Sequence, residues 1–377
     1  MQIEKMLEIP EFQKHSTLKN EFAFAAVGLA HCHIKAMCRG LVEAGAVLKF
    51  VYDANPLLTE DFVKDFPEVK ICKSEEEILE NKDIKLIASA DIPALRAPLG
   101  IRAMRAGKDF FSDKAPFVSL EQLQSIKNAC FETRRKYFVY YGERVHDESS
   151  IFADILIKRG VIGDISHIDG LAPHVLNPQS RPKWFFSKKL TGGILVDLAS
   201  HQIEQLLYYS GSDNAEIDFA RVENYFHNQF TDFEDFGYVS LVCENRVTGY
   251  FRIDWNSPAM PTWGDARTFI CGSKGYLELR KNYDISHSKS AGNIYVVIDN
   301  HEYYVNVAGK IGFPFFNALI NDCINRTETA MSQEHALKVG ELAVKAQMMA
   351  NLETTDNKLG YKSNNTFDFK PIKAKAF

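Results

Sequence analysis

The hydrophobic positions of this chain follow two different rhythms. Between residues 21 and 145, short runs of apolar residues alternate with longer segments in which apolar residues recur every three or four positions. Continuous apolar runs are typical of strands buried on both faces of a parallel sheet, and the longer period is typical of helices. Strands are expected at residues 22–27, 47–52, 85–90, 109–112 and 137–141. Helices are expected at residues 34–44, 94–106 and 120–133.

This alternation of strand and helix limits the topology of residues 21–145. Two neighbouring parallel strands need a crossover connection, and a helix normally supplies it. We therefore expect an α/β fold whose N-terminal domain is a doubly wound parallel sheet of the Rossmann type.

After residue 144 the pattern changes to runs that alternate apolar and polar residues with few helices between them. Strands are expected at residues 220–226, 237–243, 247–255, 267–271, 276–279, 294–298 and 303–307. Helices are expected at residues 149–159, 197–210, 314–325 and 333–351. Consecutive strands of this kind predict a large, mostly antiparallel open sheet, so residues 146–352 are expected to form an α+β domain.

The two ends of the chain carry weaker patterns. Residues 1–20 are expected to be an N-terminal extension, and residues 353–377 a C-terminal tail rich in Asn and Lys. The alternation at Phe367-Asp368-Phe369 can add an edge strand to a sheet.

Composition and charge exclude several classes of protein. The 377 residues are 46% hydrophobic and 25% charged, with a formal net charge of −5, which offers no electrostatic basis for binding nucleic acid or an acidic membrane surface. No apolar run approaches the roughly 20 residues of a membrane-spanning helix. The N-terminus lacks a signal-peptide pattern, and the seven cysteines contain no Cys-x-x-Cys pair. We therefore expect a cytoplasmic protein with reduced thiols.

The segment Gly28-Leu29-Ala30-His31-Cys32-His33 joins the first strand to the first helix. In a dinucleotide-binding turn, glycines allow a tight bend and a close approach of the backbone to the pyrophosphate, which the helix N-terminus holds. Gly28 fills the first glycine position, Ala30 the second and His33 the third. Asp53 ends the second strand, where a carboxylate binds the adenosine ribose and favours NAD over NADP.

The same segment admits two other interpretations. A strand–helix turn with one glycine is also common in proteins that bind no cofactor. The cluster His31-Cys32-His33 offers metal ligands, but the sequence provides no second ligand group at a matching spacing. No metal site is therefore expected.

Two further segments carry candidate chemistry. Asp113-Lys114-Ala115-Pro116 follows a short strand, so Lys114 should project at the carboxyl end of the sheet, where ligands bind in such folds. Downstream of Gly192-Gly193, Asp197 and His201 are four residues apart, hence on one face of a helix. The alternatives are a solvated lysine, a helix-capping aspartate and a packed histidine.

In this order and with these separations, the three segments resemble the glucose–fructose oxidoreductase/inositol dehydrogenase/MocA (Gfo/Idh/MocA) family. Asp-Lys-Ala-Pro is similar to the family's Glu-Lys-Pro, and the third segment matches Gly-Gly-x-x-x-Asp-x-x-x-His. The resemblance implies an NAD(P)-dependent oxidoreductase that transfers a hydride between nicotinamide and a secondary alcohol or ketone of a sugar, cyclitol or related compound. It implies that Lys114 positions the reacting oxygen, His201 is a base titrating near neutrality and Asp197 supports it.

The resemblance also implies the wider set of site residues. Those expected at the cofactor are Gly28, Ala30, His31, His33, Ile34, Asp53, Ser89, Ala90, Asp91 and Lys114. Those expected at the substrate are Arg144, Arg181, Trp184, Asp197 and His201. Glu204 stands where relatives often carry a further aspartate, so no role is transferred to it.

Two other functions remain open for such a chain. Some relatives retain NAD and use transient oxidation for elimination and net hydrolysis of a glycoside. A sensor that keeps the fold without catalysis is the other alternative, and the intact Lys114, Asp197 and His201 argue against it. In this family the open sheet commonly mediates a homodimer or homotetramer, and its polar face is expected to include Tyr250, Phe251 and Tyr295.

Overall fold

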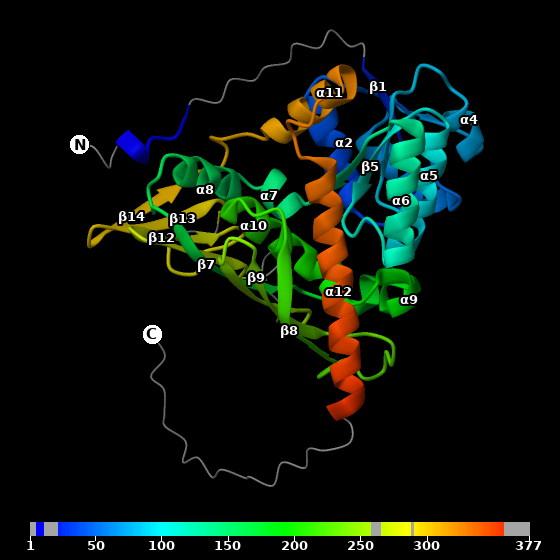
Figure 1. Ribbon diagram of the computed structural model, residues 1–377. Helices are drawn as coiled ribbons and strands as arrows, with labels where there is room; N and C mark the ends of the chain where they lie inside the picture. Colours follow the sequence, from blue (N-terminus) through cyan, green and yellow to red (C-terminus); the bar gives the residue numbers. More distant parts are fainter. Residues whose placement is uncertain (1–4, 11–21, 258–264, 288–289, 358–377) are drawn as a thin grey trace.

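The computed structural model of the protein describes residues 5–10, 22–257, 265–287 and 290–357 (Figure 1). Two sheets organise these residues. One lies among the helices α2, α5 and α6, and the other forms the opposite side of the molecule, where β12, β13 and β14 are labelled. The α/β class with two sheets, predicted from the two hydrophobic rhythms, is confirmed.

The first sheet has six strands in the order β3-β2-β1-β4-β5-β6, and every pair in it is parallel. The strands are β1 (Ala23–Val27), β2 (Val47–Tyr52), β3 (Lys70–Ile71), β4 (Leu86–Ser89), β5 (Asp109–Asp113) and β6 (Tyr137–Tyr140). All residues of β1 are buried, as the continuous apolar run predicts for a central strand. The order reverses between β1 and β4, which is where ligands bind in doubly wound folds.

Helices connect these strands as expected. They are α2 (His33–Glu43), α3 (Pro56–Asp65), α4 (Glu75–Leu79), α5 (Pro93–Arg105) and α6 (Leu120–Thr133). The sequence analysis did not predict α3, β3 or α4, because these elements are short and rich in charge and so lack a clear hydrophobic period. Local chemistry starts the two helices instead: the side chains of Asn55 and Ser74 accept hydrogen bonds from the first-turn amides of α3 and α4.

The second sheet has eight strands in the order β14-β13-β12-β11-β7-β10-β9-β8. The strands are β7 (Ile165–Pro173), β8 (Ala215–Glu223), β9 (Phe236–Cys243), β10 (Thr248–Asp254), β11 (Arg267–Gly272), β12 (Gly275–Arg280), β13 (Asn293–Ile298) and β14 (His301–Asn306). All neighbours are antiparallel except β7 and β10. The prediction missed β7 because it is only half-buried along most of its length and contains Asp169 and Gly170.

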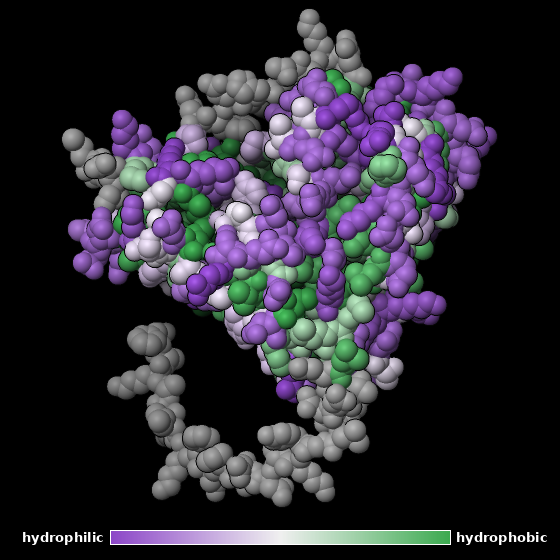
Figure 2. Space-filling view, viewed as in Figure 1, coloured by the Kyte–Doolittle hydropathy of each residue, from purple (hydrophilic) through white to green (hydrophobic). Residues whose placement is uncertain are grey.

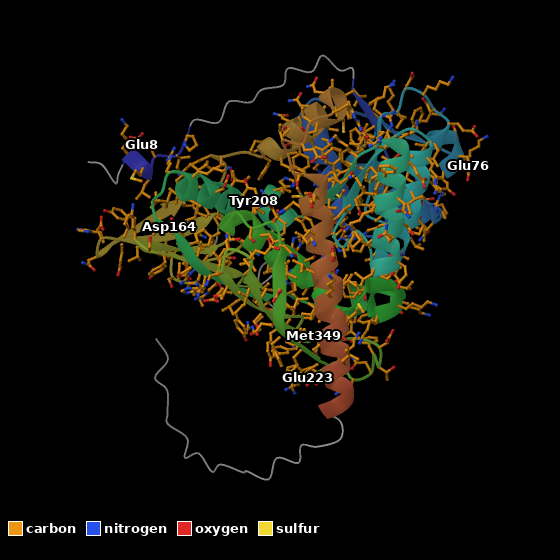
Figure 3. The ribbon with its side chains drawn as sticks, in the orientation of Figure 1. Glu8, Glu76, Asp164, Tyr208, Glu223 and Met349 are labelled. Carbon is orange, nitrogen blue, oxygen red and sulfur yellow. The ribbon has the colours of Figure 1, made fainter. Side chains whose placement is uncertain are left out.

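The helical elements of this second part face the pocket or cover the sheet. They are α7 (Gly142–Val145), α8 (Glu148–Lys158), η1 (Pro178–Ser180), η2 (Lys183–Phe186), α9 (Lys188–Thr191), the π-helical η3 (Leu195–Ala199), α10 (Ser200–Ser210), α11 (Pro314–Asn325) and α12 (Gln333–Asn357). Figure 3 shows α12 running beside β8, with Met349 and Glu223 labelled near its lower end.

The last two helices contact both parts of the chain. The Phe316 ring on α11 packs so closely on α2 that a Cβ added to Gly40 would lie 2.3 Å from it. On α12, Gln333 accepts a hydrogen bond from the amide of Tyr137 on β6, while Gln347 accepts one from the amide of Leu195. The expected division into residues 21–145 and 146–352 stays a prediction.

The surface adds three observations. Figure 2 shows a mostly hydrophilic face with hydrophobic side chains gathered around the lower half of α12. The prediction that Phe251 lies on the exposed face of the open sheet is wrong: it is fully buried, because it alternates with the exposed Tyr250. None of the helices in the described ranges is long and apolar enough to cross a membrane. The edge strand expected at Phe367 lies outside the described residues.

Candidate active site

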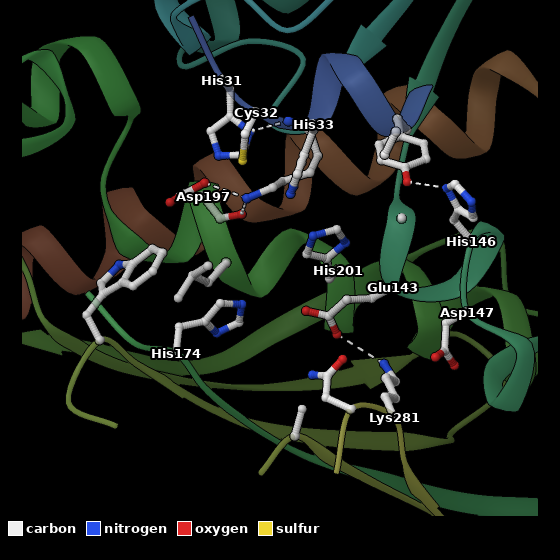
Figure 4. Close-up of a pocket in the computed structure, with 18 of the residues that line it drawn as sticks. His31, Cys32, His33, Glu143, His146, Asp147, His174, Asp197, His201 and Lys281 are labelled. Carbon is white, nitrogen blue, oxygen red and sulfur yellow. Dashed lines mark hydrogen bonds and ion pairs between the residues drawn. The ribbon is translucent and has the colours of Figure 1, made fainter. Parts of the chain in front are cut away.

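A pocket of about 460 Å³ opens where the carboxyl edge of the parallel sheet faces the second sheet (Figure 4). His31, His33 and Lys114 line it from the first part of the chain. Asp197 and His201 line it from the segment spanning η3 and α10. The structure therefore brings together three segments that are far apart in the sequence.

Lys114 joins the two sides of the pocket. Its ammonium donates to Asp197 Oδ1 at 2.6 Å and to the Asp197 carbonyl oxygen at 3.1 Å. Lys114 is 4% exposed and is linked to Ala115 by a cis peptide bond. Burial opposes ionisation of Asp197, but the charge and hydrogen bond of Lys114 lower the pKa of its carboxyl to about 2. The Asp197 carboxyl is therefore ionised at neutral pH.

Asp197 and His201 both reach the pocket, but from a helical segment that changes geometry. Asp197 lies in the π-helical turn η3, whereas His201 lies in the first turn of α10. The Asp197 carboxylate bonds to Lys114, and no hydrogen bond from it to His201 occurs among the described residues. The expected support of His201 by Asp197 is therefore not direct.

His201 is a neutral imidazole in this environment. It is 4% exposed, and its Nδ1 atom is buried without a hydrogen-bond partner among the described residues. Burial, with help from the positive Lys114, lowers the pKa of His201 to about 3, although Glu143 acts in the opposite direction. Burial therefore places the pKa of His201 below the near-neutral value expected from the sequence.

The turn after β1 has the shape that the sequence predicted. Gly28 has φ +75°, and a Cβ there would lie 2.6 Å from Asp91 Cβ, so glycine is required. The amide of His31 donates to Ala90. Among the described residues, no hydrogen bond from the amide of Ala30 or Cys32 to another residue occurs, and amides at the start of a helix are free to bind a ligand.

The other expected cofactor residues divide into two groups. Asp53 follows β2 and accepts a hydrogen bond from the Leu29 amide at 2.7 Å, so its carboxylate lies at the turn. The Ile34 side chain is buried in the core, and the Ser89 and Ala90 side chains are fully buried. None of these three residues lines the pocket.

A second charged network lies behind Lys114. Asp113 is fully buried and accepts from Arg96 at 3.1 Å, while His33 Nδ1 lies 3.0 Å from its Oδ1. Burial opposes ionisation of Asp113, but its interactions with His33 and Arg96 hold the pKa of its carboxyl well below the usual range. His31 Nδ1 is 3.4 Å from the other carboxylate oxygen. This network fixes the strand end that carries Lys114.

The floor of the pocket contains residues that the sequence analysis did not select. Lys281 donates to Glu143 at 3.0 Å and to Gln205 at 2.8 Å, and Gln202 donates to Glu143 at 2.8 Å. Figure 4 shows Glu143 below His201 and next to Lys281. His174, which follows β7, also lines the pocket. Glu143, His174 and Lys281 share one signal: each is a polar residue immediately after a strand or in the turn that follows one.

Two of the expected substrate residues lie elsewhere. Arg144 is buried against Glu204 at 2.6 Å and stacks on Tyr208 at 3.6 Å, so the assignment of Arg144 to substrate is wrong. Trp184 packs against Phe185 and does not line the pocket. The sequence pattern placed these residues near the cleft but could not determine which side of the backbone faces it.

Arg181 does line the pocket. Its Nε donates to the Leu176 carbonyl oxygen at 3.0 Å, and its guanidinium lies over Phe185 and Trp255. It forms no ion pair with any carboxylate of the described residues. Its remaining N–H groups are therefore available to a ligand.

Comparison with known proteins places these observations in a family. Residues 153–278 match the GFO/IDH/MocA C-terminal domain. A protein from Erwinia carotovora atroseptica SCRI1043, solved as a candidate oxidoreductase, is 42% identical, with a TM-score of 0.85 over 88% of this chain and 99% of its own.

Two other relatives are more distant. The scyllo-inositol 2-dehydrogenase (NADP(+)) IolW of Bacillus subtilis is 26% identical over 176 residues, 45% of this chain and 49% of its own length. The match thus spans about half the length of this curated relative. Levoglucosan dehydrogenase, solved with NADH and levoglucosan, shares the fold at 18% identity, with a TM-score of 0.73 over 88% of this chain and 97% of its own. The match of the C-terminal domain and the similarity to the Erwinia protein over nearly its whole length show that this chain belongs to the Gfo/Idh/MocA family.

Proposed function

We propose that this protein is an NAD(P)-dependent oxidoreductase that transfers a hydride between nicotinamide and the CH–OH carbon of a sugar, cyclitol or similar substrate. One observation carries the proposal: Lys114 at the edge of the parallel sheet pairs with Asp197 at 2.6 Å, in a pocket that also contains His201. A cation, a carboxylate and a neutral imidazole around one cavity are the groups needed to orient a hydroxyl and accept its proton.

The turn after β1 fits a dinucleotide. The unpaired amides of Ala30 and Cys32 suit a pyrophosphate, and the carboxylate of Asp53 suits ribose hydroxyls. A nicotinamide bound at this edge of the sheet would supply the hydride acceptor or donor. Asp53 favours NAD, because a carboxylate repels the 2′-phosphate of NADP.

Each pocket residue then has a distinct task. Lys114 donates a hydrogen bond to the reacting oxygen while Asp197 holds its ammonium in place. His201 accepts the hydroxyl proton when the substrate is oxidised and returns it when the ketone is reduced. The nearby carboxylate of Glu143 stabilises the imidazolium that forms, because opposite charges attract strongly in a buried site. Arg181 contacts the substrate at the side of the pocket.

The named relatives support this substrate class and leave the cofactor open. IolW is named for scyllo-inositol and NADP(+), and levoglucosan dehydrogenase was solved with NADH. The test is a panel of cyclitols, aldoses and their keto forms, assayed by nicotinamide absorbance with both cofactors. We expect turnover with at least one polyhydroxylated compound, faster with NAD(H), and a turnover that is strongly reduced in Lys114→Ala. Absence of nicotinamide binding by calorimetry would overturn the proposal.

We also propose a homodimer or homotetramer, located in the cytoplasm, that uses the outer face of the eight-stranded sheet. Tyr250 is 45% exposed there, and its ring lies 6.1 Å from that of Tyr238, which stacks on Phe219. An exposed aromatic row of this kind is typical of an interface. Light scattering at micromolar concentration should give at least twice the mass of one chain, and a monomer would contradict the assembly.

A further inference from the structure

The start of α2 and the end of β5 bring three metal-ligating side chains together. One ligand atom from each of His31, His33 and Asp113 lies within 4.8 Å of the others. The two histidines are separated by one residue, and the aspartate comes from 80 residues farther along the chain than His33. No pattern in the sequence predicts Asp113 as a partner of the two histidines, and the fold brings it to them.

The spacing of these atoms suits a small divalent ion. Zinc binds imidazole nitrogen and carboxylate oxygen at about 2.0–2.2 Å, which puts neighbouring ligands of a tetrahedral site roughly 3.3–3.5 Å apart. His33 Nδ1 and Asp113 Oδ1 are separated by 3.0 Å, and His31 Nδ1 and Asp113 Oδ2 by 3.4 Å. The two distances to Asp113 therefore differ from those of a zinc site by only a few tenths of an ångström.

The hydrogen bonds of His31 provide a second, independent observation. The backbone amide of His33 donates to His31 Nδ1 at 3.3 Å, so this nitrogen carries a lone pair and no proton. The same nitrogen faces a carboxylate oxygen of Asp113 at 3.4 Å. Two electron-pair donors that face each other in a buried site repel, and a cation between them removes the repulsion.

Arg96 does not consume the carboxylate. It donates to Asp113 Oδ2 at 3.1 Å, but its other N–H groups donate to the backbone oxygens of Asp91, Lys114 and Ala115. A carboxylate has about four lone-pair sites, so Asp113 keeps capacity for a metal. Arg96 then acts as the outer partner that orients a ligating carboxylate.

We propose that His31, His33 and Asp113 form a binding site for a divalent transition metal of the zinc class. Two imidazoles and one carboxylate are a ligand set that such ions prefer. The fourth position faces the pocket, where Cys32 or a water or substrate oxygen can occupy it.

This site and the nucleotide site use different atoms. The metal requires the side chains of His31 and His33, whereas the proposed pyrophosphate contacts are the backbone amides of Ala30 and Cys32. The two proposals can therefore fail separately, and NADH binding measured on the same samples tests the nucleotide site alone.

The experiment titrates the full-length protein, first treated with a chelator, with Zn²⁺ by calorimetry and with Co²⁺ by visible absorption. We expect one ion per chain and a Co²⁺ d–d band in the wild type. His33→Gln and His31→Gln should each weaken binding by more than about tenfold, since even the loss of an outer partner of a metal ligand costs 10- to 100-fold. Two variants are used so that a folding defect in one, detected by its melting temperature, does not decide the result.

His146→Gln is the matched control. This imidazole lines the same pocket but bonds to the Tyr140 hydroxyl at 2.6 Å and lies outside the cluster. It should bind both ions as the wild type does. The inference is overturned if the wild type binds no stoichiometric ion, or if His146→Gln weakens binding as much as His33→Gln.

Discussion

The two sides of the pocket hold charge by different means. On the side of the parallel sheet, free backbone amides and one buried network around Asp113 fix the turn and the strand end. On the side of the open sheet, charge is held by side chains that bond to one another: Lys281 donates hydrogen bonds to Glu143 and Gln205. Main-chain donors do not depend on residue identity, whereas side-chain donors change with every substitution.

This difference matches the proposed division of the pocket into a cofactor side and a substrate side. A dinucleotide bound by backbone amides can be common to a whole family, while each member alters its floor to suit another substrate. In this chain Lys114 and Asp197 connect the two sides across the pocket. Substitutions on the side of the parallel sheet should therefore affect cofactor binding, and those on the side of the open sheet should affect turnover of the substrate. Substitutions of Lys114 or Asp197 should affect both sides.

The largest difference between an effect on turnover and an effect on NADH affinity is expected from His201→Ala. Removing the proposed proton acceptor should lower turnover about 100- to 10,000-fold. NADH affinity should stay unchanged, because the nucleotide turn lies on the other side. The measurements are initial rates by nicotinamide absorbance and NADH binding by calorimetry.

His335→Ala is the control for this change. His335 is an imidazole on α12 that lies 3.3 Å from Glu204 and does not line the pocket. It should keep its turnover. Full activity in His201→Ala would show that His201 is a packing residue.

Lys114→Ala should break the connection between the two sides. Loss of one preorganised donor to a reacting oxygen typically lowers turnover about 100- to 1,000-fold. The variant should also be less stable, because the buried Asp197 carboxylate loses its cation. Rates and urea unfolding test both effects, with Lys158→Ala, which removes an exposed pair with Asp154, as the control that should change neither.

The sequence predicted the fold and the grouping of Lys114, Asp197 and His201 in one pocket better than it predicted the other pocket residues. The lysine, aspartate and histidine were selected because their spacing is fixed by strand ends and by one helical segment. Arg144 was misassigned because a residue at a domain boundary can turn either way, and its partner Glu204 lies 60 residues later. The sequence analysis also expected no metal near His31. Asp113 becomes a neighbour of His31 only when β5 lies beside the turn, and the spacing of residues along the chain does not indicate that contact.

The residues of the pocket floor, Glu143 and Lys281, were not predicted for a related reason. Glu143 and Lys281 are 138 residues apart, and each alone is an ordinary surface type of residue. Their pairing depends on α7, which follows the last strand of the parallel sheet, lying beside the end of β12 in the other sheet. Long-range pairing decided these positions, and local pattern could not.

Glu143→Gln tests whether the floor is a stabilising network. The change keeps the shape but removes the charge that faces the buried Lys281. Hydrogen bonds to charged groups are worth about 1.5–3 kcal/mol, so the free energy of unfolding should fall by about that amount. Urea unfolding measures it. NADH affinity should not change, and a loss of NADH affinity alone would contradict the division between the two sides.

Asp53→Ala tests the opposite side. Its carboxylate should contribute about 1.5–3 kcal/mol through hydrogen bonds to the ribose, which corresponds to roughly a 10- to 150-fold weaker NAD complex. NADP should lose much less, because it does not gain from this carboxylate. Calorimetry with both nucleotides gives the result, and equal losses would contradict the assignment of Asp53.

The last effect is that of pH, and it involves both sides of the pocket. Burial lowers the pKa of four pocket imidazoles below the ordinary value of 6.5, to about 4 in His146 and about 3 in His201. The other two are His31 and His174. Between pH 6.5 and 5.5 the unfolded chain then binds more protons than the folded one, so the free energy of unfolding should fall as the pH falls.

Each of these imidazoles can lower the free energy of unfolding by up to about 1.4 kcal/mol per pH unit as the pH falls. The carboxylates with lowered pKa values reduce the free energy of unfolding only below about pH 4.5. Urea unfolding at pH 7.5, 6.5 and 5.5 measures the slope. His146→Gln should reduce the slope, because the imidazole it removes titrates only in the unfolded chain over this range. His301→Gln is the control: this imidazole lies on the exposed β14, and its replacement should leave the slope unchanged. A wild-type stability that stays constant from pH 7.5 to 5.5 would show that the pocket imidazoles reach solvent, which would remove the physical basis for a neutral His201 as the proton acceptor.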